Sequence, residues 1–262
     1  MTSETKQARL GRRLRLCSYN IQVGNASVRP HHYITQSWKY LLPDRRRLDT
    51  LNSIAQFIGD YDIVTLQETD AGSMRTHYVN QTEYLAEKAK FPFWHDQVNR
   101  NMGRMAQHSQ GLLSRLLPSQ VTVHRLPGMI PGRTAMLARY GKGKHALAVL
   151  GMHLALGKRT RVRQLDFISE LISDYKYAVI MGDLNCEPGS AEMRTLMKKI
   201  HMHDPFEEKN TFPSWRPSKQ LDHILVADSL HVSHVHVPKH SYSDHLPIAT
   251  DIIVPPDIHL LS

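Results

Sequence analysis

Short apolar segments that end in a polar residue recur along this chain. The segments 14–19, 62–67, 146–152 and 179–182 are followed by Asn20, Glu68, His153 and Asp183, and the pair Asp244 and His245 precedes a last apolar run at 248–254. Apolar runs of this length are typical of buried β-strands. We therefore predict strands that deliver chemically active side chains at their ends.

Other segments complete an alternating pattern of strands and helices. We predict further strands at 111–115, 133–140, 222–226 and 232–237, and helices over 45–58, 81–90, 160–175 and the segment that Ser190 can cap. Residues 99–108 have the composition of a loop. Roughly eight or more strands are too many for one comfortably packed open sheet in a chain of this size. An α/β fold with two stacked sheets and helices outside them, a four-layer sandwich, is the expected arrangement.

No composition break or Gly/Ser linker divides the chain, so we expect one domain over 13–256, preceded by a flexible basic tail at 1–12. The segment 24–44 is irregular and rich in aromatic and basic residues. It is either a loop that contacts substrate or a surface excursion that packs back on the body, and the sequence does not favour one of the two.

The predicted functional site is centred on the segment 179–185, Val-Ile-Met-Gly-Asp-Leu-Asn. Residues i and i+2 of a strand point to the same face, so Asp183 and Asn185 can converge on one ligand. The alternative is that both serve only as turn residues. The similar ends of the other strands favour a functional site.

Composition limits the possible partners. The chain has 33 basic and 24 acidic residues and a net charge of +9, which favours phosphate-rich partners such as nucleic acid or anionic lipid. Cys17 and Cys186 are too few and too isolated for a disulfide framework or a thiolate metal site, so a reducing cytoplasm fits best. The first 15 residues lack the apolar core of a signal peptide, and no apolar run is long enough to span a bilayer. We expect a soluble protein, a monomer.

The strand-end side chains define a hard, oxygen-rich site. Carboxylates and amides without cysteines suit Mg²⁺ or Mn²⁺ better than Zn²⁺. Glu68 is the strongest ligand candidate, with Asn20 assisting, and Asp183 can orient or deprotonate a water while Asn185 holds a phosphate oxygen. His245, with an ordinary pKa of about 6.5, can exchange protons at neutral pH once Asp222 or Asp244 fixes its tautomer.

Most of the histidines have other interpretations. The chain contains 17 of them, so any single one has a low prior of being catalytic. We interpret His31, His32, His231, His234 and His236 as surface or loop residues and leave His223 undecided. His153 could be a core histidine at a strand end, but its place among the other strand ends favours catalysis.

A series of short motifs resembles a known family. They are Tyr19-Asn20, Leu66-Gln67-Glu68, Leu113-Ser114-Arg115, His153-Leu154, Gly182-Asp183-Leu184-Asn185, Leu221-Asp222-His223-Ile224 and Ser243-Asp244-His245. Each motif alone is weak, but in this order they resemble the endonuclease/exonuclease/phosphatase superfamily over residues 14–254, as in its small bacterial-type members. The resemblance implies a deoxyribonuclease-I-like sandwich of two sheets and divalent-metal-dependent hydrolysis of phosphate esters by direct attack of water.

The resemblance also implies a role for each matching position. Glu68 and Asn20 match the metal site, and Asp244 matches a metal-side or phosphate-side carboxylate. Asp183 and Asn185 match the pair that orients the nucleophile and binds phosphate. His245 matches the histidine beside the scissile phosphate, and Asp222 matches the acid that orients it. Arg115, Arg133 and Arg161 join Asn185 as the candidate substrate-binding residues.

Departures from the family pattern narrow the branch. Apurinic-site endonucleases place a tyrosine-bearing motif where this chain has Met152-His153-Leu154 and an aspartate where it has Gln22. His153 instead resembles the second histidine of pancreatic-type deoxyribonucleases, bacterial sphingomyelinases and inositol-phosphate phosphatases. The pair Arg161 and Gln164 resembles that of many small bacterial members. Repair of abasic sites is therefore not the expected activity.

Three functional hypotheses follow. The first is a magnesium-dependent nuclease or nucleotide-directed phosphodiesterase, favoured by the net charge and the basic tail. The second is a phospholipid or inositol-phosphate phosphodiesterase or phosphatase, for which the aromatic residues of 33–40 would meet a membrane surface. The third is a binding module without catalysis. Because Glu68, Asp183, Asn185 and His245 are all present, the third is the weakest.

Overall fold

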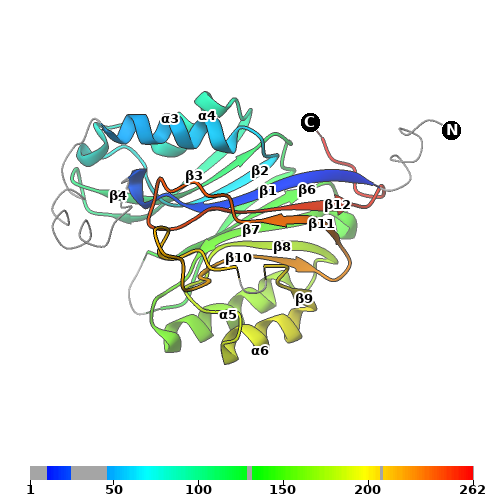
Figure 1. Cartoon of the computed structure of the whole chain (residues 1–262). Helices are drawn as coiled ribbons and strands as arrows, with labels where there is room; N and C mark the ends of the chain where they lie inside the picture. The colour runs from blue at the N-terminus through cyan, green and yellow to red at the C-terminus, as the bar shows by residue number, and fades with distance from the viewer. Residues whose placement is uncertain (1–10, 25–45, 129–131, 207–208, 262) are drawn as a thin grey trace.

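Two six-stranded sheets stack face to face in the computed structural model of this chain, and helices cover the outer side of each sheet (Figure 1). The structure describes residues 11–24, 46–128, 132–206 and 209–261. Residues 1–10 of the predicted tail at 1–12, and residues 25–44 of the aromatic segment, which include His31 and His32, lie outside these residues. The four-layer α/β sandwich is confirmed.

The first sheet has the strand order β11-β12-β1-β2-β4-β3. Its strands are β1 (Arg12–Asn20), β2 (Ile63–Asp70), β3 (Phe93–Asn101), β4 (Gln107–Ser114), β11 (His231–His236) and β12 (Ile248–Val254). Two helices, α3 (Arg46–Ile58) and α4 (Gln81–Ala89), pack on its outer face (Figure 1). Short 3-10 turns at Gln22–Gly24 and Met74–Thr76 follow β1 and β2.

The second sheet has the order β5-β6-β7-β8-β10-β9. Its strands are β5 (Gln120–Arg125), β6 (Thr134–Tyr140), β7 (Leu147–His153), β8 (Tyr177–Asp183), β9 (Met202–His203) and β10 (Asp222–Ala227), with a 3-10 turn, Gly143–His145, before β7. Helices α5 (Lys158–Ile172) and α6 (Ala191–Ile200) cover the outer face of this second sheet. The Ser190 hydroxyl caps α6 by accepting a hydrogen bond from the backbone N–H of Met193, as predicted.

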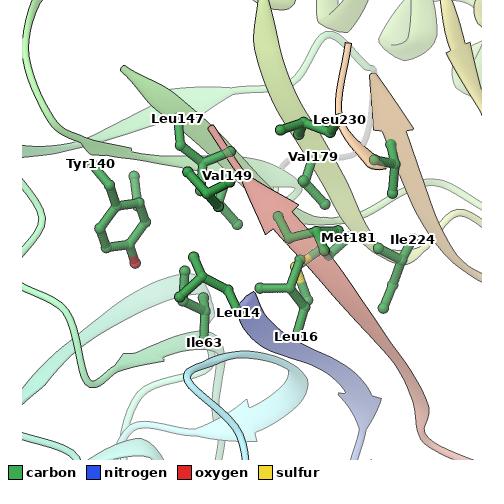
Figure 2. Packing of buried hydrophobic residues seen from close by; sticks show 14 of the residues in the cluster. Leu14, Leu16, Ile63, Tyr140, Leu147, Val149, Val179, Met181, Ile224 and Leu230 are labelled. Carbon is green, nitrogen blue, oxygen red and sulfur yellow. The ribbon is translucent and has the colours of Figure 1, made fainter. Parts of the chain in front are cut away.

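The central strands are apolar on both faces. One face packs against the other sheet, and the opposite face packs against the helices. In β8, Val179 and Met181 point toward the other sheet, whereas Ala178 and Ile180 point toward α5 and α6. Figure 2 shows the inter-sheet layer, in which Leu14 and Leu16 of β1 lie against side chains of the second sheet. Burial on both faces explains why these strands read as continuous apolar runs.

The sequence pattern predicted the edge strand β11 but missed the other edge strands, β3, β5 and β9. Residues 99–108 were expected to form a loop, but β3 extends to Asn101 and β4 begins at Gln107. Neither β3 nor β5 was expected, and each is an edge strand of its sheet. Edge strands are only half-buried, so their apolar pattern is weak. Strand β9, the other edge of the second sheet, has only two residues.

Candidate active site

The polar strand ends predicted from sequence lie at one end of the sandwich. Parallel pairing places Asn20 of β1 opposite Gln67 of β2, and places His153 of β7 opposite Asp183 of β8. Antiparallel pairing adds Asp222 of β10, which is the register partner of Asp183. The Nδ2 of Asn20 donates to Oδ2 of Asp183 at 3.1 Å and thereby links the two sheets.

Unusual backbone conformations shape the end of β8. Gly182 has φ +147°, and a Cβ at this position would collide with the Met152 carbonyl oxygen, so only glycine lets β7 and β8 lie this close. Asn185 has φ +52° in the left-handed region, which asparagine tolerates. Its backbone N–H donates to Oδ1 of Asp183 at 3.0 Å, and its Nδ2 donates to the Leu154 carbonyl at 2.9 Å. The turn thus fixes both Asp183 and Asn185.

A β-bulge presents Glu68. The register of β2 against β4 shifts between Leu66 and Thr69, and Glu68 within the bulge has φ +55°. Bulges often redirect a side chain beside an active site, and a non-glycine residue in this region stores strain. The Glu68 carboxylate accepts a hydrogen bond from the Asn20 side chain.

Asp183 is the centre of the cluster. Besides Asn20, its Oδ2 faces Nε2 of His153 at 3.4 Å and Nε2 of His245 at 3.8 Å. Burial raises the pKa of Asp183 to about 7; the charges of Asp222 and Glu68 add to the rise, and the charge of His245 opposes it. A carboxylate whose pKa lies near neutrality is suited to accept a proton from water.

The two histidines at Asp183 carry different charges. Nδ1 of His245 donates to Oδ2 of Asp222 at 2.8 Å, and the same oxygen accepts from the Thr211 hydroxyl at 2.6 Å. Burial alone would lower the pKa of His245, but Asp222 and Asp183 raise it to about 10. Burial and the charges of Arg133 and His245 instead hold the pKa of His153 well below its ordinary value. At neutral pH the site therefore contains an imidazolium beside a neutral imidazole.

The donor set fits a divalent cation. Burial raises the pKa of Glu68, and the charge of Asp244 raises it further, so a nearby positive charge would stabilise the ionised form. Oxygen ligands of this kind are those that Mg²⁺ prefers. Asp183, Asp222 and His245 also place one potential ligand atom each within 4.8 Å of one another. Since Asp222 already accepts from His245, Glu68 is the better first ligand.

Of the three arginines expected to bind substrate, only Arg133 faces the site. It precedes β6 and lies close enough to Glu68 and Asp183 for their charges to act on its pKa, which burial lowers. Guanidinium groups pair well with phosphate oxygens, so Arg133 stays a candidate for substrate binding.

Arg115 and Arg161 have structural partners instead. Arg115 lies at the opposite end of β2 from Glu68, where its guanidinium donates to the carbonyls of Gly59, Tyr61, Ala89 and Lys90. Arg161 donates to Glu192 at 2.8 Å and to the Leu156 carbonyl at 2.8 Å. The guanidinium donors of these two side chains hold the chain together in this structure, and their role in substrate binding stays a prediction.

Sequence reasoning left His223 undecided, and the structure gives it a supporting position. It is fully buried; its Nδ1 lies 2.7 Å from Oδ2 of Asp204, and its Nε2 lies 2.8 Å from the Cys186 carbonyl. Burial alone would lower its pKa, but Asp204 and the Cys186 carbonyl raise it. His223 therefore ties the turn that follows Asn185 to the loop that carries Asp204.

Phe212 and Thr211 were not singled out from the sequence. The Phe212 ring packs against His245 with 4.8 Å between ring centroids, and Thr211 shares Asp222 with that histidine. Both precede β10 in a segment without helical or strand periodicity. The only available signal was their closeness in sequence to Asp222.

The sequence matches a known family. The profile of the Endonuclease/Exonuclease/phosphatase family matches residues 17–245, and the chain belongs to this family. The family consists of phosphoric ester hydrolases, so the chain is an enzyme of that class. Family members generally use a divalent metal. No curated protein sequence matches the chain at a significant level.

Solved structures share the fold at low sequence identity. A mannosyl-6-phosphatase from Bacteroides thetaiotaomicron is 18% identical, with a TM-score of 0.68. The match covers 92% of this chain and 99% of the phosphatase chain. The beta toxin 275-280 from Staphylococcus aureus is 16% identical with a TM-score of 0.64, covering 90% and 99%. A humanized D. rerio TDP2 is 15% identical with a TM-score of 0.63, covering 92% and 98%. At these identities the likeness shows the fold.

The helices of the described segments give no sign of a membrane crossing: none is both long and apolar enough to span a bilayer. Cys17 and Cys186 are both free and buried.

Proposed function

We propose that this enzyme hydrolyses phosphodiester bonds with the help of a divalent cation, by direct attack of a water that Asp183 activates. The observation that supports the proposal most strongly is the environment of Asp183. Its Oδ2 accepts a hydrogen bond from Asn20 of the first sheet and faces His153 and His245. Its pKa of about 7 allows the carboxylate to take a proton at neutral pH.

The remaining residues divide the work around the phosphate. Glu68, with Asn20 and Asp244, would hold the cation, which when bound would neutralise phosphate charge and stabilise a leaving oxygen. Asn185 and Arg133 would hold the non-bridging phosphate oxygens by hydrogen bonds and charge.

His245 supplies positive charge to the reaction. Asp222 fixes its ring, and the raised pKa keeps it protonated at neutral pH, so the imidazolium can stabilise charge that develops on phosphate. The water oxygen forms a bond to phosphorus as the bond to the leaving oxygen breaks, and Asp183 takes the water proton. No covalent enzyme intermediate forms in this scheme.

Two substrate classes suit this chemistry. The net charge of +9 favours a polynucleotide or a nucleotide. A lipid phosphodiester is the second candidate, because Met74, which follows β2, and Met102 and Met105, which lie between β3 and β4, are exposed. Mg²⁺ is the expected cation, with Mn²⁺ as a possible substitute.

A hydrolysis panel tests the proposal. Purified protein would be assayed with Mg²⁺, with Mn²⁺ and with a chelator on single- and double-stranded DNA, RNA, nucleotides, phosphoinositides and sphingomyelin. We expect turnover of at least one substrate that requires the metal and is lost in Asp183→Asn. A Leu117→Ser variant, altered at the opposite end of β4, should keep full activity.

Two results would contradict the proposal. If no substrate of the panel is hydrolysed in a metal-dependent way and calorimetry detects no Mg²⁺ binding, the non-catalytic binding module becomes the better hypothesis. Full turnover in Asp183→Asn would remove this residue from the mechanism.

A further inference from the structure

Exposed methionines gather where the β3–β4 connection meets the loop after β2. The side chains of Met102 and Met105 are 42% and 48% exposed, and that of Met74 is 42% exposed. Single exposed apolar residues are common, but a contiguous group calls for a partner. Met74 lies far from Met102 and Met105 in the sequence, so contacts between their segments decide whether the three form a group.

Backbone hydrogen bonds join the two segments. The N–H of Met74 donates to the carbonyl of Arg104 at 2.8 Å, which places Met74 beside the residue preceding Met105. The N–H of Met102 donates to the Ala106 carbonyl at 2.8 Å and closes the tip of the connection. The segments that carry Met74, Met102 and Met105 are therefore held side by side, and we call these three exposed methionines the methionine rim.

The rim is basic as well as apolar. Arg100, at the end of β3, and Arg104, on the connection, are both exposed and flank Met102 in the sequence. Neither 71–80 nor 99–108, the two segments that form the rim, contains an aspartate or a glutamate. Apolar side chains among cations, without carboxylates, complement an anionic surface that has an apolar interior.

The rim borders the active site. The loop with Met74 begins directly after β2, whose bulge presents Glu68, and the N–H of Ala71 donates to the Gln107 carbonyl at 3.0 Å. On the other side, Gly132 packs against the backbone of Asn99, next to Arg133. A surface that binds the rim is therefore brought close to the site.

We propose that the methionine rim docks the enzyme on an anionic phospholipid bilayer, with Met74, Met102 and Met105 entering the boundary between headgroups and acyl chains. A polynucleotide would use the arginines but not the methionines, because protein–nucleic acid interfaces are more polar and gain affinity from phosphate contacts and stacked aromatic rings. Docking is a property of the surface and holds independently of the proposed hydrolysis.

Vesicle sedimentation tests the proposal. The full chain would be mixed with vesicles of phosphatidylcholine that contain about 30 mol% phosphatidylglycerol, and with vesicles of phosphatidylcholine alone. We expect binding to the anionic vesicles and about tenfold or greater loss of partitioning in the double variant Met102→Ser/Met105→Ser, because two apolar anchors are removed.

Two variants serve as controls. Leu117→Ser changes a side chain that is 41% exposed at the other end of β4 and should bind as wild type does. Asp183→Asn should also bind normally, so a failure of the catalytic proposal would leave the docking result intact. Thermal melts would verify that each variant is folded.

Three results would overturn the proposal. They are no binding of wild-type protein to the anionic vesicles, equal binding by the methionine double variant, and loss of binding to a single-stranded oligonucleotide in that variant while vesicle binding stays unchanged. The third would assign the rim to a polynucleotide.

Discussion

Asp70 and Asp183 are both buried aspartates at the ends of central strands, one in each sheet, yet their surroundings shift their pKa values in opposite directions. Asp70 ends β2 and is fully buried, and Asp183 ends β8 with 2% of its surface exposed. Burial alone would raise the pKa of Asp70, but the Ser73 N–H and the Arg75 guanidinium lower it. The pKa of Asp183 rises to about 7.

The difference lies in the donors. The carboxylate of Asp70 accepts from the backbone N–H groups of Gly72, Ser73 and Gln107, the hydroxyls of Ser73 and Thr76, and Nε of Arg75 at 2.5 Å. Asp183 accepts from Asn185 and Asn20 near 3 Å, while its two histidines remain at 3.4 and 3.8 Å. A carboxylate saturated with close donors stabilises the fold, whereas one with few remains able to take a proton.

The largest expected effect is on catalysis. His245→Gln should lower kcat by about 10³-fold, because the imidazolium that we propose to stabilise charge on the phosphate is lost. Steady-state kinetics on the best substrate of the panel would measure it. His231→Gln, a change at an exposed histidine of the edge strand β11, should leave kcat unchanged. Similar losses in both variants would contradict a special role for His245.

Glu68→Gln should weaken cation binding more than it slows the chemical step. The neutral amide removes a charged ligand, so the Mg²⁺ concentration that gives half-maximal rate should rise by at least about tenfold. A metal titration of the rate would measure this shift. An unchanged titration curve with a lower maximal rate would place the cation away from Glu68.

At Asp70 the expected effect is on stability. Asp70→Asn breaks the buried pair with Arg75 and should lower the free energy of unfolding by about 3 kcal/mol in urea denaturation. Asp166→Asn, which loses only an exposed contact with Lys199 at 4.0 Å, should change it by less than about 0.5 kcal/mol. Equal effects would show that the Asp70 network does not stabilise the fold.

The stability that Asp70 contributes should depend on pH. A carboxyl whose folded pKa is below its ordinary value of 3.8 contributes stability that is fully present above 3.8 and is lost as pH falls through the folded pKa. The stability difference between wild type and Asp70→Asn should therefore shrink as pH falls from about 5 toward 2. A difference that grows toward acid pH would contradict the lowered pKa.

The smallest expected effect is at Arg115. Arg115→Lys keeps the charge but loses the planar set of donors to four carbonyls, so stability should fall by about 1–2 kcal/mol. The value of kcat/KM should stay within about twofold of wild type, because the residue lies at the far end of β2. Chemical denaturation and steady-state kinetics on the same preparation would measure both, and a large loss of kcat/KM would return Arg115 to the site.

The sequence predicted the central strands and the side chains that they deliver. Continuous apolar runs mark strands buried on both faces, and the polar residue that ends each run lies where the strand leaves the core. Asn20, Glu68, His153 and Asp183 were found in this way. The fold brings these side chains together, because the parallel strands β1 and β2 of one sheet and β7 and β8 of the other end at the same side of the sandwich.

The partners of the arginines, and the edge strands β3, β5 and β9, could not be predicted in the same way. Arg115 donates to the carbonyl of Lys90, 25 positions away, and Arg161 pairs with Glu192, 31 positions away. No local pattern encodes such contacts. Burial is the main cause of the raised pKa of Asp183, and part of the rise comes from Asp222, which the antiparallel pairing of β8 with β10 places opposite it.

The most direct test of the account measures activity and stability together in Asp183→Asn. We predict that kcat falls by about 10³-fold while the free energy of unfolding at pH 8 is unchanged or higher, because the variant removes a buried charge with few compensating donors. Retained kcat, or a loss of activity that follows a loss of stability as large as that of Asp70→Asn, would contradict the account.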